Sequence, residues 1–184
     1  MPDAIVIGDG PGGLSAALFL AKNGLEVVVF GQDKTAMHAA MLFNYLGIEE
    51  ISGTDFQRIA RKQVAERGGT LRDERVASLA RADDGFVVTT EGGDMVKARY
   101  LVLSEGKSPR LARAIGLQPM ESGGIATDGN GLSEVPGAYV VGRSRRPGRS
   151  QAIISAGDGA AAAIDILSRV KGEDVCDWDV PEAG

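Results

Sequence analysis

The stretch that decides the fold runs from Ala4 to Asp33 and reads "AIVIGDGPGGLSAALFLAKNGLEVVVFGQD". Two apolar, β-branched runs, residues 4–8 and 26–30, are typical of parallel strands buried on both faces. Between them a glycine-rich turn leads into an alanine- and leucine-rich run, which predicts a helix over residues 12–23 that Gly24 ends. The stretch therefore predicts the strand, helix and strand of an α/β fold with a central parallel sheet.

Within this stretch Gly8, Gly10 and Gly13 form the pattern G-x-G-x-x-G directly after a strand, as in dinucleotide-binding units. Gly8 would make the tight turn, Gly10 would let the backbone approach a pyrophosphate, and Gly13 would let the helix lie close to the sheet. Asp33, at the end of the second strand, is expected to bind the ribose of the adenosine. The neighbouring Lys34 either pairs with a phosphate or is simply solvated. The alternative is a Rossmann-like fold whose glycines only make a turn.

The rest of the chain continues the α/β pattern and ends in helical sequence. A Thr54 and Gln57 capping box predicts where the second helix begins, and Gly-containing turns divide an antiparallel three-stranded addition. The expected elements are a helix at 54–67, the antiparallel strands within 76–98, parallel strands at 100–104 and 138–141, and a helix at 152–170. We expect one domain over residues 1–184, in which residues 171–184 are a polar C-terminal tail.

Composition excludes several classes of function. The formal net charge of −5 argues against a broad nucleic-acid surface. With one cysteine, Cys176, and one histidine, His38, this chain can form neither a Cys-x-x-Cys pair nor a His/Cys metal site, so no metal is expected. The N-terminal residues lead straight into a strand, with no signal peptide or membrane anchor. We therefore expect a cytoplasmic protein that contacts no membrane.

Several stretches together resemble the FAD-binding domain of thioredoxin reductase-like flavoproteins, in the pyridine nucleotide–disulfide oxidoreductase family. They are "IGDGPGGLSAA" with its Pro11, "VVVFGQDK", "ISGTDFQRIARKQVAERGG", "LVLSEG", "EVPGAYVVG" and "SQAIISAGDGAAAA". The resemblance implies FAD as the cofactor and an oxidoreductase or electron-transfer flavoprotein as the function. It also implies a homodimer.

Two-domain members of that family carry an NADPH domain and the Cys-x-x-Cys pair after the segment that matches "LVLSEG". Here "KSPRLARAIGLQPMESGGIATDGNGLSEVPG" follows, which is too short for a second βαβ unit. The resemblance thus implies a FAD domain alone. Its electron donor or acceptor would be external: a free nicotinamide nucleotide, a small redox protein or a separate subunit.

The resemblance also assigns cofactor-binding residues beyond the first glycines. They are Pro11, Val76 through its backbone, Gly106, Gly142, Arg143, Gln151 and Ala152. Relatives have aspartate where Arg143 stands, so we expect Arg143 to offset Asp9 and the phosphates together. Arg145, Arg146 and Arg149 are expected in an exposed loop, where a partner or an anionic substrate could meet them.

Three questions stay open from the sequence. His38 follows the second strand, where relatives pass near the flavin, and is either a proton donor or structural. Its neighbours Met37, Met41 and Phe43 are expected in the core or in a dimer interface. The function itself has two alternatives, which are a non-enzymatic nucleotide-binding or scaffold subunit and an NAD(P)-binding Rossmann protein.

Overall fold

The centre of the molecule is a five-stranded parallel sheet with the strand order β10-β9-β1-β2-β5. The computed structural model describes residues 1–180. The strands of this sheet are β1 (Ala4–Ile7), β2 (Val27–Phe30), β5 (Thr70–Arg72), β9 (Tyr100–Leu103) and β10 (Ala138–Val140). Every residue of β1, β9 and β10 is buried, because each of these strands is covered on both faces.

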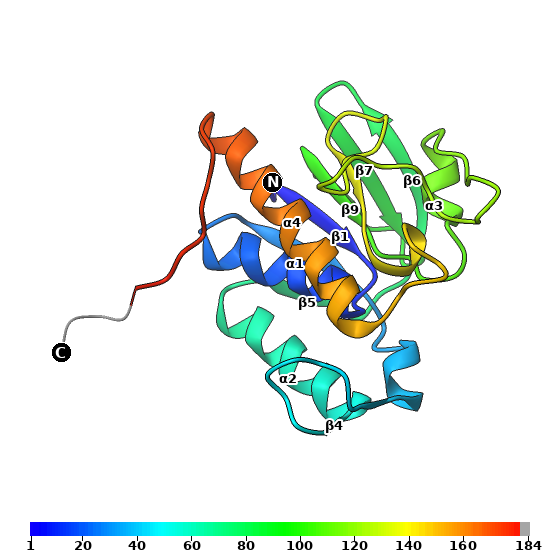
Figure 1. Ribbon diagram of the computed structural model, residues 1–184. Helices are drawn as coiled ribbons and strands as arrows, with labels where there is room; N and C mark the ends of the chain where they lie inside the picture. The colour runs from blue at the N-terminus through cyan, green and yellow to red at the C-terminus, as the bar shows by residue number, and fades with distance from the viewer. Residues whose placement is uncertain (181–184) are drawn as a thin grey trace.

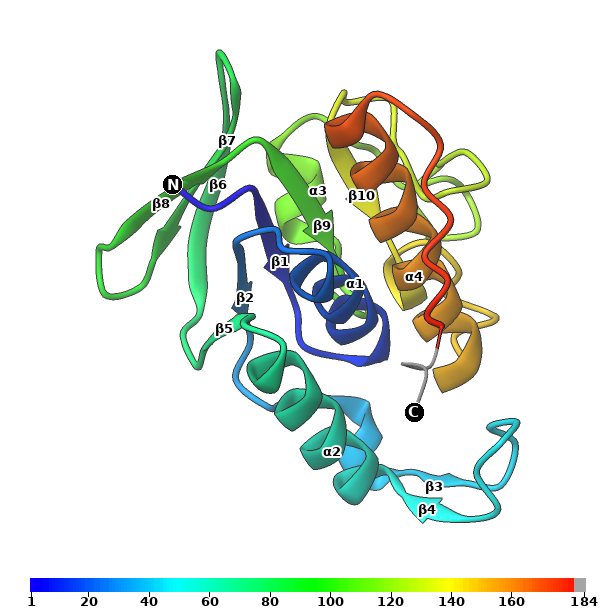
Figure 2. The same ribbon diagram turned by 90° about the vertical axis from the view of Figure 1, so that its left-hand side faces the viewer.

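Helices cover one face of this sheet and a second sheet covers the other (Figures 1 and 2). The helical side consists of α1 (Pro11–Lys22), α2 (Gly53–Glu66) and α4 (Ala152–Lys171). The opposite side holds the antiparallel strands β6 (Val76–Ala82), β7 (Gly85–Thr90) and β8 (Met95–Ala98), together with the short helix α3 (Arg110–Ala114). Beside α2, β3 (Met41–Leu42) and β4 (Ile51–Ser52) form a small hairpin (Figure 2).

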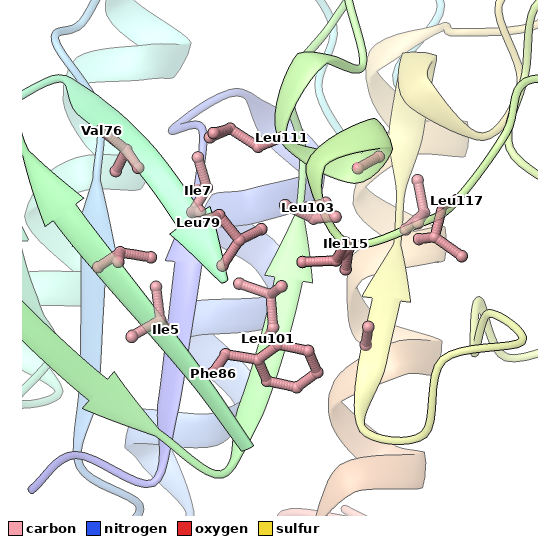
Figure 3. Close-up of a cluster of buried hydrophobic side chains, with 14 of the residues drawn as sticks. Ile5, Ile7, Val76, Leu79, Phe86, Leu101, Leu103, Leu111, Ile115 and Leu117 are labelled. Atoms are coloured by element: carbon pink, nitrogen blue, oxygen red, sulfur yellow. The ribbon is translucent and has the colours of Figure 1, made fainter. Parts of the chain in front are cut away.

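Alternate residues of the central strands supply two separate hydrophobic cores. Ile5 and Ile7 of β1 point toward the three-stranded sheet, where they join Leu79, Phe86 and the side chains around α3 (Figure 3). Ala4 and Val6 face the helices instead. This period of two within a buried strand explains why the apolar run shows no polar alternation.

Glycines set the distance between α1, α4 and the sheet. A methyl group on Gly159 of α4 would overlap the carbonyl oxygen of Gly12, and one on Gly13 would overlap that of Gly8. Gly8 itself has a φ of +99°, which a residue with a side chain rarely adopts. The conformation of the glycine-rich turn therefore requires glycine at positions 8 and 13, and its packing against α4 requires glycine at position 159.

The predicted α/β class, the parallel sheet and the three-stranded antiparallel sheet are confirmed, and the predicted element ends lie within one residue of the observed ones. The fifth parallel strand, β5, was not predicted. It has only three residues and no alternating pattern, and it is a strand because β2 offers it a partner. The short elements β3, β4 and α3 were likewise not predicted.

The capping box predicted at Thr54 and Gln57 is wrong. The helix begins one residue earlier, and the Oγ of Ser52 accepts the Asp55 backbone N–H at 3.0 Å while donating to the Asp55 carboxylate. Gln57 is instead fully buried, and its amide donates to the backbone carbonyl of Asp9. Two hydroxyl residues, Ser52 and Thr54, stand at this helix start, and Ser52 is the cap.

The C-terminal segment follows α4, which Gly172 ends in a left-handed conformation. Lys22 at the end of α1 holds this segment through ion pairs to Asp177 at 2.9 Å and Asp179 at 2.6 Å. Of the predicted tail, residue 171 belongs to α4, and residues 181–184 lie outside the described residues. Within residues 1–180, no helix has both the length and the apolar character needed to cross a membrane.

Candidate functional site

A cleft of about 630 Å³ opens at the carboxyl ends of the parallel strands. Ile7, Phe30 and Ser104, at or directly after the ends of β1, β2 and β9, form its floor, and Val76 of β6 lies in its wall. The carboxyl edge of a parallel sheet is where α/β folds bind their ligands, and the volume lies within the range of known ligand pockets.

Two helices point their N-termini into this cleft. Pro11 and Gly12 bring the start of α1, and Ala152 and Ser155 bring the start of α4. Neither helix has a side-chain cap, and neither has an acidic residue in its first turn. The unpaired N–H groups and the positive ends of two helix dipoles thus converge, an arrangement that favours an anion such as phosphate.

Nine of the twelve predicted site residues line this cleft, although the sequence scatters them from β1 to α4. They are Gly8, Gly10, Pro11, Lys34, Val76, Gly106, Gly142, Arg143 and Ala152. The carbonyl of Val76 already accepts a hydrogen bond from Arg110 at 2.7 Å. The fold therefore gathers most of the predicted set at one place.

Gly13, Asp33 and Gln151 do not line the cleft. Gly13 lies buried behind it and lets α1 pack against the turn at Gly8, as predicted for packing. Gln151 is the exposed N-cap of α4, and its side-chain oxygen accepts from Asn44 at 3.4 Å.

Asp33 is held away from the cleft by His38. The Nε2 of His38 lies 3.1 Å from the Asp33 carboxylate and 2.8 Å from the Asp33 carbonyl, and its Nδ1 lies 3.1 Å from the hydroxyl of Thr54. The two contacts with Asp33 lie within the loop around the 3₁₀ turn η1 (Ala36–Ala39), and the third reaches Thr54 in the first turn of α2. Both ring nitrogens are thus engaged by protein groups, and the arrangement favours the structural interpretation of His38 over a proton donor.

The pairing expected between Arg143 and Asp9 is wrong. The Asp9 carboxylate forms an ion pair with Arg61 of α2, and its Oδ2 also accepts the backbone N–H of Asp33 at 2.9 Å. Arg61 additionally pairs with Asp73. Burial lowers the pKa of Arg61, but the carboxylates of Asp73, Asp9 and Asp33 outweigh it and raise the pKa above its ordinary value. Arg61 lies 52 residues after Asp9 along the chain, so nothing in the sequence pattern connects the two residues.

The arginine-rich loop is more ordered than the sequence indicates. The side chain of Arg145 is nearly buried and donates to Asp158 of α4 at 2.7 Å, and Arg146 donates to the same oxygen at 3.2 Å. The other oxygen of Asp158 accepts the Gly142 backbone N–H at 3.3 Å. The assignment of Arg145 to an exposed loop is therefore wrong, because the buried Asp158 requires a cationic partner. Arg146 and Arg149 are exposed, as expected.

Glu105 is a cleft residue to which the sequence assigned no role. Its carboxylate oxygens accept the backbone N–H groups of Leu111 at 2.7 Å and Ala112 at 2.9 Å, at the start of α3. Burial raises the pKa of the Glu105 carboxyl, although these two hydrogen bonds act in the opposite direction. Glu105 thus fixes the cleft wall, and its spacing of six to seven residues from its partners matches no local capping motif.

The remaining charges of the cleft are mainly cationic. Lys34, Lys107 and Arg143 have no carboxylate partner among the described residues. The acidic residues Asp9, Glu74 and Glu105 are each engaged by protein donors. Over residues 1–180, no group of three or more His, Cys, Asp or Glu side chains could hold a metal ion. The site is therefore suited to an anionic ligand.

Comparison with known proteins gives matches along most of the chain. The family model of pyridine nucleotide-disulphide oxidoreductases matches residues 2–54. The chain is 29% identical over 173 residues to a bifunctional thioredoxin reductase/thioredoxin of Mycobacterium leprae, which covers 91% of this chain and 35% of the relative. It is 25% identical over 179 residues to a ferredoxin–NADP reductase of Lactococcus lactis subsp. cremoris, covering 93% of this chain and 53% of the relative. The chain thus spans about a third to a half of these curated relatives.

Solved structures share the fold at lower identity. A thioredoxin reductase from Gloeobacter violaceus superimposes with a TM-score of 0.85 at 18% identity, covering 97% of this chain and 99% of that one. A ferredoxin-flavin thioredoxin reductase from Clostridium acetobutylicum gives 0.78 at 18% identity, covering 93% and 98%.

Proposed function

We propose that this chain, which matches the family model of the pyridine nucleotide–disulphide oxidoreductases over residues 2–54 and is similar to thioredoxin reductases, binds FAD in the cleft and functions as a flavin-dependent oxidoreductase. The observation that carries this proposal is the convergence of the glycine-rich turn and two uncapped helix N-termini on one cleft. A dinucleotide has its negative charge at its centre, and two such helix ends supply the donors for it.

The residues present fit such a ligand. The turn at Gly8 and Gly10 and the first N–H groups of α1 would hold the pyrophosphate, with Arg143 and Lys107 as further cations. The start of α4, with Gly142 before it, would lie against the flavin half. Gln151 would contribute through its backbone only, because its side chain points to Asn44.

When bound, FAD would supply the hydride or electron transfer itself, while the protein binds and orients it. We propose that electrons come from or go to an external carrier, either a nicotinamide nucleotide or a small redox protein. Two features support this. The connection from β9 to β10, residues 104–137, contains only α3 and isolated bridges, and the chain has one cysteine.

The first experiment is titration of the purified chain with FAD, followed by flavin absorbance and fluorescence, and then addition of NADPH or NADH. We expect saturable FAD binding and bleaching of the bound flavin if a nicotinamide nucleotide is the donor. FAD binding without bleaching would favour a redox protein as the donor or a non-enzymatic role. Absence of FAD binding would refute the proposal, and binding of NADH alone would favour the NAD(P)-binding alternative.

Arg143 gives a sharper test of the site. We expect Arg143→Ala to weaken FAD binding about tenfold, a change of about 1.4 kcal/mol, because a cation without a carboxylate partner is lost from the cleft. Arg149→Ala is the matched control, since Arg149 is exposed and does not line the cleft. Both variants are titrated with FAD and compared with the wild type. Equal binding by all three proteins would remove Arg143 from the site.

We also propose that the chain is a homodimer and that the loop between β3 and β4 belongs to its interface. Phe43 and Leu46 of this loop are 70% and 89% exposed, which is unusual for two large apolar side chains so close together. Met41, beside them, is also exposed, whereas Met37 packs into a small core with Leu42 and Ala152.

A further inference from the structure

Dinucleotide-binding folds ordinarily place an acid at the end of the second strand, where it binds the ribose hydroxyls. In this chain β2 ends at Phe30, and the next residues are Gly31, Gln32 and Asp33. Gly31 and Gln32 line the cleft, but neither has a carboxylate. The one acid of this segment, Asp33, is turned out of the cleft toward His38. The second strand therefore brings no acid to the cleft.

Another carboxylate occupies the position where such a side chain would lie. A methyl group built on Gly31 would overlap Cβ, Cγ and Oδ1 of Asp9, which belongs to the glycine-rich turn and lines the cleft. The acid therefore comes from the turn after β1 and fills the space that Gly31 leaves free. From this we propose that Asp9, rather than Asp33, binds the adenosine ribose hydroxyls of the dinucleotide. This inference rests on the proposed function.

The two oxygens of Asp9 differ in a way that supports this role. Oδ2 is occupied by Arg61 and by the backbone N–H of Asp33. Oδ1, the oxygen next to Gly31, accepts no hydrogen bond from any residue that the structure describes. A carboxylate that is almost buried keeps one acceptor for a donor from outside the chain, and ribose hydroxyls are donors of the right kind.

The surroundings of Asp9 also reduce the electrostatic repulsion expected between its carboxylate and a nearby pyrophosphate. Arg61 pairs directly with Asp9, so the turn carries little net negative charge. Gln57 donates to the Asp9 carbonyl and holds the backbone from the same helix, α2. Asp9 is thus positioned from behind by two side chains of α2, and its free oxygen is the part that remains for a ligand.

A side chain at position 31 and the side chain of Asp9 cannot occupy the same space. The acid can therefore be moved from position 9 to position 31 by exchanging the two residues. An aspartate at position 31 would collide with Asp9, but the double variant Asp9→Gly with Gly31→Asp removes the collision. Gly31 does not have a positive φ, so its backbone accepts an aspartate. In the double variant, Asp at position 31, directly after β2, would place its carboxylate in the space that Asp9 occupies in the wild type.

The experiment uses competition of ADP and 2′-deoxy-ADP against FAD bound to the full chain, because these probes differ only in the ribose hydroxyl. We expect wild type to prefer ADP about tenfold. The preference should fall below about threefold in Asp9→Asn, remain in Asp33→Asn and return in the exchanged double variant. Circular dichroism and thermal melts of each variant check that the fold is kept.

The outcomes separate the inference from the proposal on which it rests. If wild type binds neither FAD nor ADP, the proposed function fails and the inference fails with it. If wild type binds FAD but shows no preference for ADP, or loses that preference in Asp33→Asn and keeps it in Asp9→Asn, only the role of Asp9 is overturned. Recovery in the exchanged variant would support the role even if Asp9→Asn is less stable.

Discussion

At the scale of single residues, Asp165 connects the sheet to α4. The ring of Tyr139 on β10 is fully buried, and its hydroxyl donates to Asp165 at 2.5 Å, while Arg169 donates to the same carboxylate at 2.7 Å. Burial raises the pKa of Asp165, but the hydrogen bonds from Arg169, Tyr139 and Asn130 outweigh it and lower the pKa below its usual value. Burial and Asp165 together raise the pKa of Tyr139, so this phenol stays protonated.

These contacts predict a pH-dependent loss of stability. A carboxyl group with a lowered pKa in the folded state stabilises the fold above its unfolded pKa of about 3.9, and this contribution is lost as the pH falls through the folded value. We expect Asp165→Asn to cost about 1–2 kcal/mol at pH 7. Urea unfolding of both proteins at pH 7, 4 and 3 should show the difference narrowing below about pH 4. A constant difference across this range would exclude the ionised carboxylate as its cause.

At the scale of elements, the close approach of α1 and α4 depends on glycine. Ser155, Gly159 and Ala162 of α4 are buried on one face of this helix, whereas Gly157 is exposed and has no atom near its missing side chain. The two glycines of α4 therefore differ in environment but share a helix, which provides a matched pair of substitutions.

We expect Gly159→Ala to destabilise the fold by about 1–3 kcal/mol, because its methyl group would overlap the Gly12 carbonyl and separate the helices. Gly157→Ala should instead stabilise by about 0.5–1 kcal/mol through helix propensity. Chemical denaturation measures both. Gly12 lies in the first turn of α1 and lines the cleft, so the Gly159 variant should also bind FAD more weakly. Equal effects of the two substitutions would contradict the close packing.

At the scale of the whole molecule, the apolar loop between β3 and β4 lies at the end of the hairpin that projects beside α2 (Figure 2). Light scattering on a size-exclusion column should find a dimer for wild type and a monomer for Phe43→Ser with Leu46→Ser. Met95→Ser is the control, because Met95 is an exposed apolar residue on the distant β8. A monomeric wild type, or a double variant that stays dimeric, would remove this loop from the interface.

Local sequence determined much of this protein. Strands buried on both faces of a parallel sheet have unbroken runs of β-branched residues. Positions with a positive φ or a close helix contact require glycine. These two patterns predict β1, α1, β2 and the turn between β1 and α1 from residues 4–33. The same holds for the long helix α4. Nine of the twelve predicted site residues line the cleft, and several of these nine were assigned through the family resemblance.

The tertiary structure alone decided which charges meet. Asp9 forms an ion pair with Arg61, which lies 52 residues away in the sequence, and Arg145 forms one with Asp158 on the following helix. The side chain of Asp33 contacts His38 and does not line the cleft. β5 is a strand only because β2 lies beside it. The physical reason is that backbone conformation follows from local sterics and periodicity, whereas an ion pair or an edge strand depends on a partner whose distance along the chain carries no pattern.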